Sequence, residues 1–146
     1  MKAAMNITAE MVAQIRAIAE RFGALLVVQF GSTVRGTTHA ESDLDLAVQF
    51  EVYDGRAFER VQEMQAALQS VLPGRRVDLA ILNHADPLFL RTVVESSRLV
   101  YGAAADFARL RLRAFKRYQD FLPYLAMERR YVTSRVASLR GEKRPT

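Results

Sequence analysis

Residues 24–50 of the chain read ALLVVQFGSTVRGTTHAESDLDLAVQF, and they contain two segments typical of β-strands. The first, Leu25–Phe30, is a nearly continuous apolar run, as expected for a buried strand. The second, Asp43–Phe50, alternates between apolar and polar or small residues. Gly31-Ser32 ends the first strand, and a short helical turn is expected over residues 33–36. A strand, a turn and a second strand therefore begin the predicted sheet.

Helices are predicted on both sides of this stretch from the spacing of apolar residues. They cover 9–22, 54–71, 87–95 and 104 almost to the C-terminus. The predicted capping residues are Thr8, Gly23, Asp54 and Asp86, with His84 assisting the third helix. Pro123 is expected to kink or divide the last segment.

Two further strands are expected at Arg76–Leu82 and Leu99–Tyr101. Strands that alternate with helices predict an α/β (α+β) domain with a small mixed sheet and flanking helices. We expect this domain to occupy residues 1–103. A helical extension over residues 104–146 would pack on the domain, on a partner or on both.

Composition excludes several classes of site. The 146 residues include no cysteine and two histidines, so disulfides, thiolate metal sites and multi-histidine zinc sites are not expected. A bound metal would be held by oxygen, which favours Mg²⁺ or Ca²⁺. The longest strictly apolar run, Ala24–Val28, is too short to cross a membrane, and no signal peptide is apparent. A cytoplasmic location is therefore expected.

The net charge of +5 is concentrated at the C-terminal end. Residues 1–103 carry a net charge of −2, and residues 104–146 carry a net charge of +7. This basic segment is interpreted as a solvated helix face, or else as a contact surface for an acidic partner or RNA. Direct nucleic-acid binding is not expected, because its aromatic residues fit helix packing better than base stacking.

Three aspartates are predicted to lie on one face of the sheet. Asp43 and Asp45 alternate with apolar residues, so they share a face at a Cα separation of roughly 7 Å. Asp78 has the same position in the third strand, and it joins the pair if the strands are neighbours. Such a carboxylate cluster requires cations, which favours one or two Mg²⁺ ions. The alternative is a solvated sheet face without a ligand.

Gly31-Ser32 is a candidate phosphate-binding turn. Glycine permits close approach of a ligand to the backbone, and a helix N-terminus offers free N–H groups to an anion. Taken alone, Gly31-Ser32 also fits a glycine turn in which the serine caps the following helical turn and no ligand binds. Arg35, about one turn further, could contact a phosphate or pair with a carboxylate of the sheet.

The order Gly-Ser, ten residues, Asp-x-Asp and a third strand aspartate resembles the signature of the polymerase-beta-like nucleotidyltransferases. The stretches FGSTVRGTTHAESDLDLAV (30–48) and VDLAILNHADPLFLRTVVESSRLVYG (77–102) are similar to the minimal nucleotidyltransferase (MNT) antitoxins of HEPN/MNT toxin–antitoxin systems. The resemblance covers about residues 8–102.

This resemblance implies an enzyme that transfers AMP from ATP to a tyrosine hydroxyl of a HEPN RNase toxin. It implies that Gly31 and Ser32 hold the triphosphate and that Asp43 and Asp45 hold two Mg²⁺ ions. Asp78 would bind the ion nearer the acceptor and help to deprotonate it. Two alternatives remain: transfer to a small molecule such as an aminoglycoside, and an antitoxin that neutralises its partner by binding alone. His39 and His84 are assigned no catalytic role.

Overall fold

A computed structural model describes residues 7–31 and 43–142 of the chain. The elements, in chain order, are α1 (Ala9–Arg21), β1 (Ala24–Phe30), β2 (Leu44–Phe50), α3 (Ala57–Val71), β3 (Val77–Ile81), α4 (Pro87–Glu95), β4 (Ser97–Tyr101) and α5 (Ala104–Glu142). Every predicted strand is present, with its ends within two residues of the expected positions. The predicted turn at 33–36 lies outside the described residues.

The four strands form one mixed sheet in the order β3-β2-β1-β4. β1 is antiparallel to both β2 and β4, whereas β2 and β3 are parallel. The mixed sheet agrees with the sequence analysis, and the last strand, β4, lies at one edge. The neighbouring positions of β2 and β3 are decisive for the site, because each carries an aspartate.

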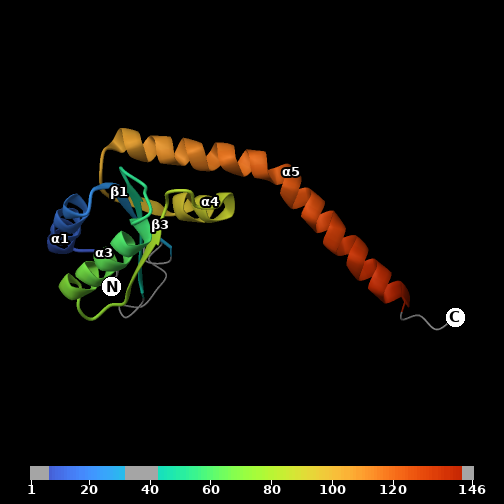
Figure 1. The fold of residues 1–146 in the computed structure, drawn as a ribbon, viewed down its shortest axis with the longest axis horizontal. Helices are drawn as coiled ribbons and strands as arrows, with labels where there is room; N and C mark the ends of the chain where they lie inside the picture. The colour runs from blue at the N-terminus through green and yellow to red at the C-terminus, as the bar shows by residue number, and fades with distance from the viewer. Residues whose placement is uncertain (1–6, 32–42, 143–146) are drawn as a thin grey trace.

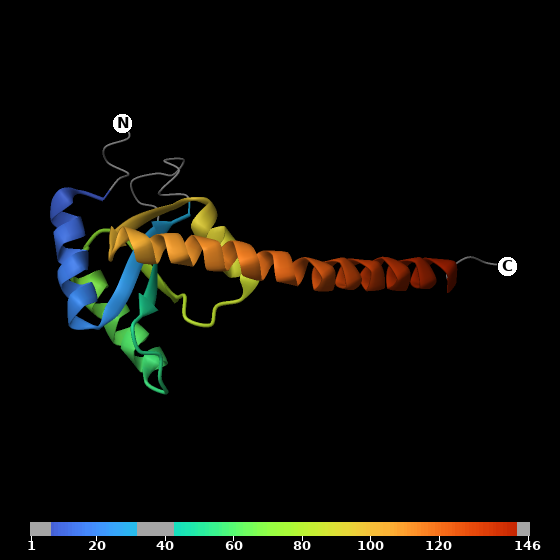
Figure 2. The same cartoon turned by 90° about the horizontal axis from the view of Figure 1, so that it is seen from above.

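Helices cover both faces of the sheet (Figures 1 and 2). α1 and α3 bury one face, where Ile15, Met64 and Leu68 pack with the apolar side chains of β2. α4 and the first part of α5 bury the other face, where Leu90 and Leu110 pack with residues of β1 and β2. The alternating apolar set of β2 is therefore fully buried under α1 and α3, and its other face points toward α4 and α5.

Three of the predicted helix ends are confirmed. The Thr8 side chain accepts a hydrogen bond from the Met11 N–H at 3.1 Å and begins α1. Gly23 follows α1 with a φ of +73°, a left-handed conformation that glycine adopts without strain. Asp86 accepts from the Phe89 N–H at 2.9 Å and caps α4.

Two capping predictions are wrong. Asp54 does not cap α3, because its Oδ1 accepts from the Arg56 N–H two residues later and from the Arg60 guanidinium. Because of this turn, the helix begins at Ala57 rather than directly after Asp54. Arg56 is the N-cap residue, and its side chain makes no capping hydrogen bond. His84 does not cap α4 either, since its ring lies against Tyr53 at a centroid distance of 4.7 Å.

α5 remains one helix of 39 residues with Pro123 inside it. Figure 1 shows that it bends once, so the predicted kink is confirmed and the predicted division is not. Proline removes one backbone donor from the helix and clashes with the preceding turn, which accounts for the bend. No helix in the described part of the chain is long and apolar enough to span a membrane.

The two parts of α5 differ in burial. Leu110 and Ala114 are fully buried against the sheet. From Tyr124 to Gly141 every side chain is exposed except Leu125, which is half-buried. This second part extends away from the body, as Figure 2 shows, and we call residues 124–141 the distal segment.

Candidate active site

The parallel pairing of β2 and β3 brings two of the predicted aspartates together. Asp45 of β2 is in register with Asp78 of β3, on strands that lie about 4.8 Å apart. Their neighbours Leu44, Leu46 and Leu79 pack into the core beneath α1 and α3. By alternation, both carboxylates project from the opposite face. The register therefore places Asp45 and Asp78 side by side.

Asp43 completes this acidic group at the start of β2. It is exposed and lies immediately before the strand, two residues from Asp45. The pKa of Asp45 is raised from its ordinary value, first by burial and then by the negative charges of Asp78 and Asp43. The three carboxylates are thus close enough to repel one another. A cation would relieve this repulsion.

Gly31 contacts the same carboxylate from β1. Phe30, the last residue of β1, is paired with Asp45, so the following turn begins beside this aspartate. A Cβ atom on Gly31 would lie only 2.8 Å from Oδ2 of Asp45, and the φ of Gly31 is +81°. The positive φ favours glycine here, and a side chain at this position would also crowd the Asp45 carboxylate. The glycine leaves open a space against the carboxylate that a side chain would fill.

These residues fit a hard cation bound together with a nucleotide. In the described parts of the chain, no three acidic or histidine side chains form a complete metal-ligand set. Mg²⁺ does not need a complete set of protein ligands, because it is commonly held by one or two carboxylates and by substrate phosphates. The all-oxygen donors, the raised pKa of Asp45 and the open space at Gly31 all suit this arrangement.

Ser32 and Arg35, the other two predicted phosphate ligands, lie outside the described residues, as does His39. Their roles stay predictions. Gly31 and Asp43 are the described residues on either side of this segment, and both lie beside Asp45 in sequence or in space.

The sequence analysis missed a cation beside Asp78. The Nε of Arg76 lies 3.5 Å from Oδ1 of Asp78, and the Arg76 side chain is 73% exposed. An ion pair so exposed contributes little to stability. The Arg76 guanidinium thus lies at the edge of the acidic group, with most of its surface in contact with solvent.

Two glutamines of α3 hold the strand that carries Asp78, and the sequence analysis missed them as well. Gln69 Oε1 accepts from the Val77 N–H, and Gln65 Oε1 accepts from the Leu79 N–H, both at 2.9 Å. The Gln69 amide also donates to the Arg75 carbonyl at 2.6 Å. β3 is an edge strand, so these bonds replace those of a missing neighbour. Asp78 lies between the two anchored residues and is held in place by them.

The spacing of these glutamines was the only signal in the sequence. Gln65 and Gln69 are four residues apart on α3 and therefore lie on one side of the helix. Nothing in this spacing identifies an edge strand as their partner. The assignment required the tertiary structure.

Comparison with known proteins shows which family this chain resembles. The family model described as polymerase beta nucleotidyltransferase matches residues 13–106, more than half of the chain. These residues include all four strands and the three aspartates. A comparison with curated proteins finds no match.

Several solved toxin–antitoxin structures share the fold. One is the tri-AMPylated Shewanella oneidensis HEPN toxin in complex with MNT antitoxin, with 21% identity, a TM-score of 0.64, and coverage of 94% of this chain and 99% of that chain. A toxin–antitoxin structure with AMP-PNP has 26% identity, a TM-score of 0.63 and coverage of 86% and 98%. The toxin–antitoxin MntA–HepT has 22% identity, a TM-score of 0.60 and coverage of 89% and 99%.

The carboxylates on neighbouring strands, the glycine beside them and the match over residues 13–106 lead to one assignment. This chain belongs to the polymerase beta nucleotidyltransferase family.

Proposed function

We propose that the chain is an antitoxin that transfers AMP from ATP to a tyrosine hydroxyl of a HEPN toxin. The observation that carries this proposal is the grouping of Asp45, Asp78 and Gly31 at one end of the sheet. Similar folds occur in complexes of MNT antitoxin with HEPN toxin, one of them tri-AMPylated. A further similar structure, 26% identical, contains the ATP analogue AMP-PNP.

In this proposal the nucleotide lies between the glycine turn and the carboxylates. Gly31 and Ser32 hold the triphosphate through the backbone and a hydroxyl, with Arg35 on the β- or γ-phosphate. Asp43, Asp45 and Asp78 would hold Mg²⁺, as two ions. When bound, Mg²⁺ neutralises the charge that develops on the phosphate oxygens.

The transfer itself is an in-line displacement. The tyrosine oxygen of the toxin forms a bond to the α-phosphorus, and the bond from that phosphorus to the pyrophosphate oxygen breaks. Asp78 accepts the phenolic proton, since it lies at the edge of the group with its side chain 45% exposed. Pyrophosphate leaves, and AMP remains on the tyrosine.

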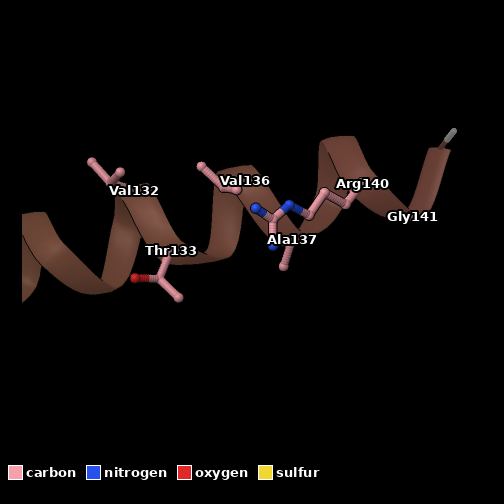
Figure 3. Close-up of a pocket in the computed structure, with 6 residues that line it drawn as sticks. All are labelled: Val132, Thr133, Val136, Ala137, Arg140 and Gly141. Carbon is pink, nitrogen blue, oxygen red and sulfur yellow. The ribbon is translucent and has the colours of Figure 1, made fainter.

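The distal segment of α5 supports a protein acceptor rather than a small molecule. It carries exposed large apolar residues on a helix that touches little of its own chain, at positions 124, 127, 131, 132, 136 and 139. Figure 3 shows Val132 and Val136 on one side of the helix, with Thr133 and Ala137 on another. All the residues labelled there belong to one helix, so they form an open surface. Exposed apolar surface of this kind is typical of a partner interface.

Incubation with ATP, Mg²⁺ and a HEPN toxin tests the proposal, and the first candidate is a HEPN protein encoded in a neighbouring reading frame. We expect the mass of the HEPN protein to rise by whole AMP units on tyrosine, together with loss of its RNase activity. The chain without ATP is the control, and it should leave the RNase active. RNase inhibition without any change in mass would contradict transfer and would favour neutralisation by binding alone.

Replacement of Gln65 and Gln69 with methionine tests whether the position of Asp78 matters. Methionine is similar in length and suits a helix, but it leaves the Val77 and Leu79 N–H groups without their acceptors. We expect kcat for AMP transfer to fall by about 10- to 100-fold, because small displacements of a reacting group are costly. The Kd for ATP should change far less.

Gln62→Met is the matched control, since Gln62 is exposed on the same helix. It should leave kcat unchanged. Equal losses of ATP affinity and kcat in the double variant would indicate general loosening of the fold rather than displacement of Asp78.

A further inference from the structure

A polar pocket lies at the other end of the sheet face that carries Asp45. It has a volume of about 200 Å³ and is lined by Gln49, Asn83, His84, Arg113 and Arg117. Gln49 is on the same face of β2 as Asp45 but four residues further along, which corresponds to about 13 Å. The pocket is therefore separate from the candidate active site.

Two arginines dominate this pocket. Arg113 and Arg117 are one turn apart on α5, on the part of the helix that packs against the body. The Arg113 Nη2 donates to Gln49 Oε1 at 3.1 Å, and the Arg117 Nη1 donates to the Ala85 carbonyl at 2.8 Å. The interpretation of this basic face as simply solvated is thus wrong for these two residues, which are half-buried and bonded to the body.

Neither guanidinium has a carboxylate partner within the described ranges 7–31 and 43–142. Arg109, one turn earlier on the same helix, is paired with Asp106 at 2.7 Å. Burial lowers the pKa of Arg113, and the adjacent charge of Arg117 lowers it further. Two positive charges are thus held together, partly out of water, with neutral acceptors alone.

The opposite wall of the pocket is held firmly. The Asn83 side chain accepts from the Phe50 N–H at 2.8 Å and donates to the Phe50 carbonyl at 3.1 Å. His84 has a φ of +58°, an uncommon conformation for a residue other than glycine. Its ring rests on Tyr53. This wall of the pocket therefore needs little rearrangement to receive a ligand.

We propose that the pocket lined by Arg113 and Arg117 is a second anion site, and that it binds a phosphate group. A phosphate offers several oxygens to two guanidiniums, which bind it through paired charge-assisted hydrogen bonds. The amide of Gln49 and the imidazole of His84 supply further polar contacts. The phosphate belongs either to a small molecule such as pyrophosphate or to an RNA backbone.

Titration of the full chain in EDTA with pyrophosphate, and separately with a short RNA that lacks terminal phosphates, tests this site. NMR signals of the arginine Nε–H groups identify the residues that respond. We expect the signals of Arg113 and Arg117 to shift with one of these probes, which also identifies the source of the phosphate. The absence of Mg²⁺ keeps the proposed catalytic site from contributing, so failure of one proposal does not affect the other.

Single substitutions locate the binding. Arg113→Gln and Arg117→Gln should each weaken it by about 10-fold or more, since a charge-assisted bond is lost. Arg111→Gln makes the same change at an exposed position of the same helix, where the guanidinium lies over Phe107. This control should leave the affinity within about twofold of the original.

Gln49→Glu provides a test that does not weaken the fold. The new carboxylate would lie where Gln49 Oε1 now accepts from Arg113, so it would pair with this guanidinium and take the place of the phosphate. We expect a higher Tm and loss of phosphate binding. No binding of either probe by the unmodified chain would overturn the proposal, as would equal binding by the Gln49→Glu variant.

Discussion

Simultaneous replacement of Asp43 and Asp45 with asparagine is expected to lower AMP transfer by about a thousandfold or more, which corresponds to about 4 kcal/mol of transition-state stabilisation. Asparagine keeps the size of both side chains but removes the charges that would hold Mg²⁺ beside the triphosphate. Transfer can be measured as AMP incorporated into the HEPN protein. The variant should still bind that protein.

A matched control carries Glu59→Gln and Glu63→Gln, which remove two exposed negative charges from α3. It has the same net charge as the aspartate variant and should transfer AMP normally. A double aspartate variant that labels its partner at the original rate would exclude this site. If the variant cannot transfer AMP but still protects cells at normal expression, the antitoxin acts by binding alone.

The same aspartate variant is expected to be more stable than the original chain near neutral pH. The pKa of Asp45 is raised in the folded chain, so the folded chain binds this proton more tightly than the unfolded chain does. Ionisation of Asp45 as the pH rises therefore lowers the stability of the fold. Removal of the repulsion should raise the Tm by about 2–4 °C at pH 7. The gain should shrink as the pH falls toward the ordinary pKa of an aspartate. An equal increase in Tm at pH 7 and pH 4 would contradict charge repulsion as the cause of the added stability.

Truncation after Pro123 is expected to abolish modification of the HEPN protein while binding of Mg·ATP is kept. The distal segment carries exposed apolar residues, whereas Gly31, Asp45 and Asp78 lie in the sheet. Loss of two or more interface anchors should weaken partner binding by more than about a hundredfold. Calorimetry with each ligand measures the two affinities separately. The truncated chain must also melt cooperatively, because the remaining part of α5 still packs on the body.

Substitutions in the full-length chain test the same docking surface without shortening α5. Val132→Asp with Val136→Asp places charges on one side of the distal segment, and Thr133→Asp with Ala137→Asp places the same charges on another side (Figure 3). The valine variant should lose the partner, because Val132 and Val136 continue an apolar stripe that includes Leu125 and Leu139. The threonine–alanine variant should keep it. Equal binding by both variants and the truncated chain would show that the partner docks elsewhere.

Much of the candidate site could be predicted from the sequence because it depends on local rules. Alternation along residues 43–50 places Asp45 on the face opposite the buried leucines, and this alternation does not depend on the packing of the rest of the chain. The apolar runs and the glycine at position 31 likewise define strands and a turn from near neighbours. Asp54 failed as a predicted cap because a carboxylate can bond two or three residues ahead, and the sequence does not distinguish these turns.

Other features depend on residues far apart in the chain. The sequence alone determined that Asp43, Asp45 and Asp78 share a strand pattern, and that Gly31 starts a turn. Only the tertiary structure decided that β2 pairs with β3 in a register that joins Asp45 to Asp78, and that Gln65 and Gln69 hold this edge strand. It also decided that Arg113 and Arg117 turn inward, because α5 packs beside Gln49 and Ala85. Local preferences specify which face a side chain takes, but the partners on that face are chosen by long-range packing, and the chemistry of the site depends on those partners.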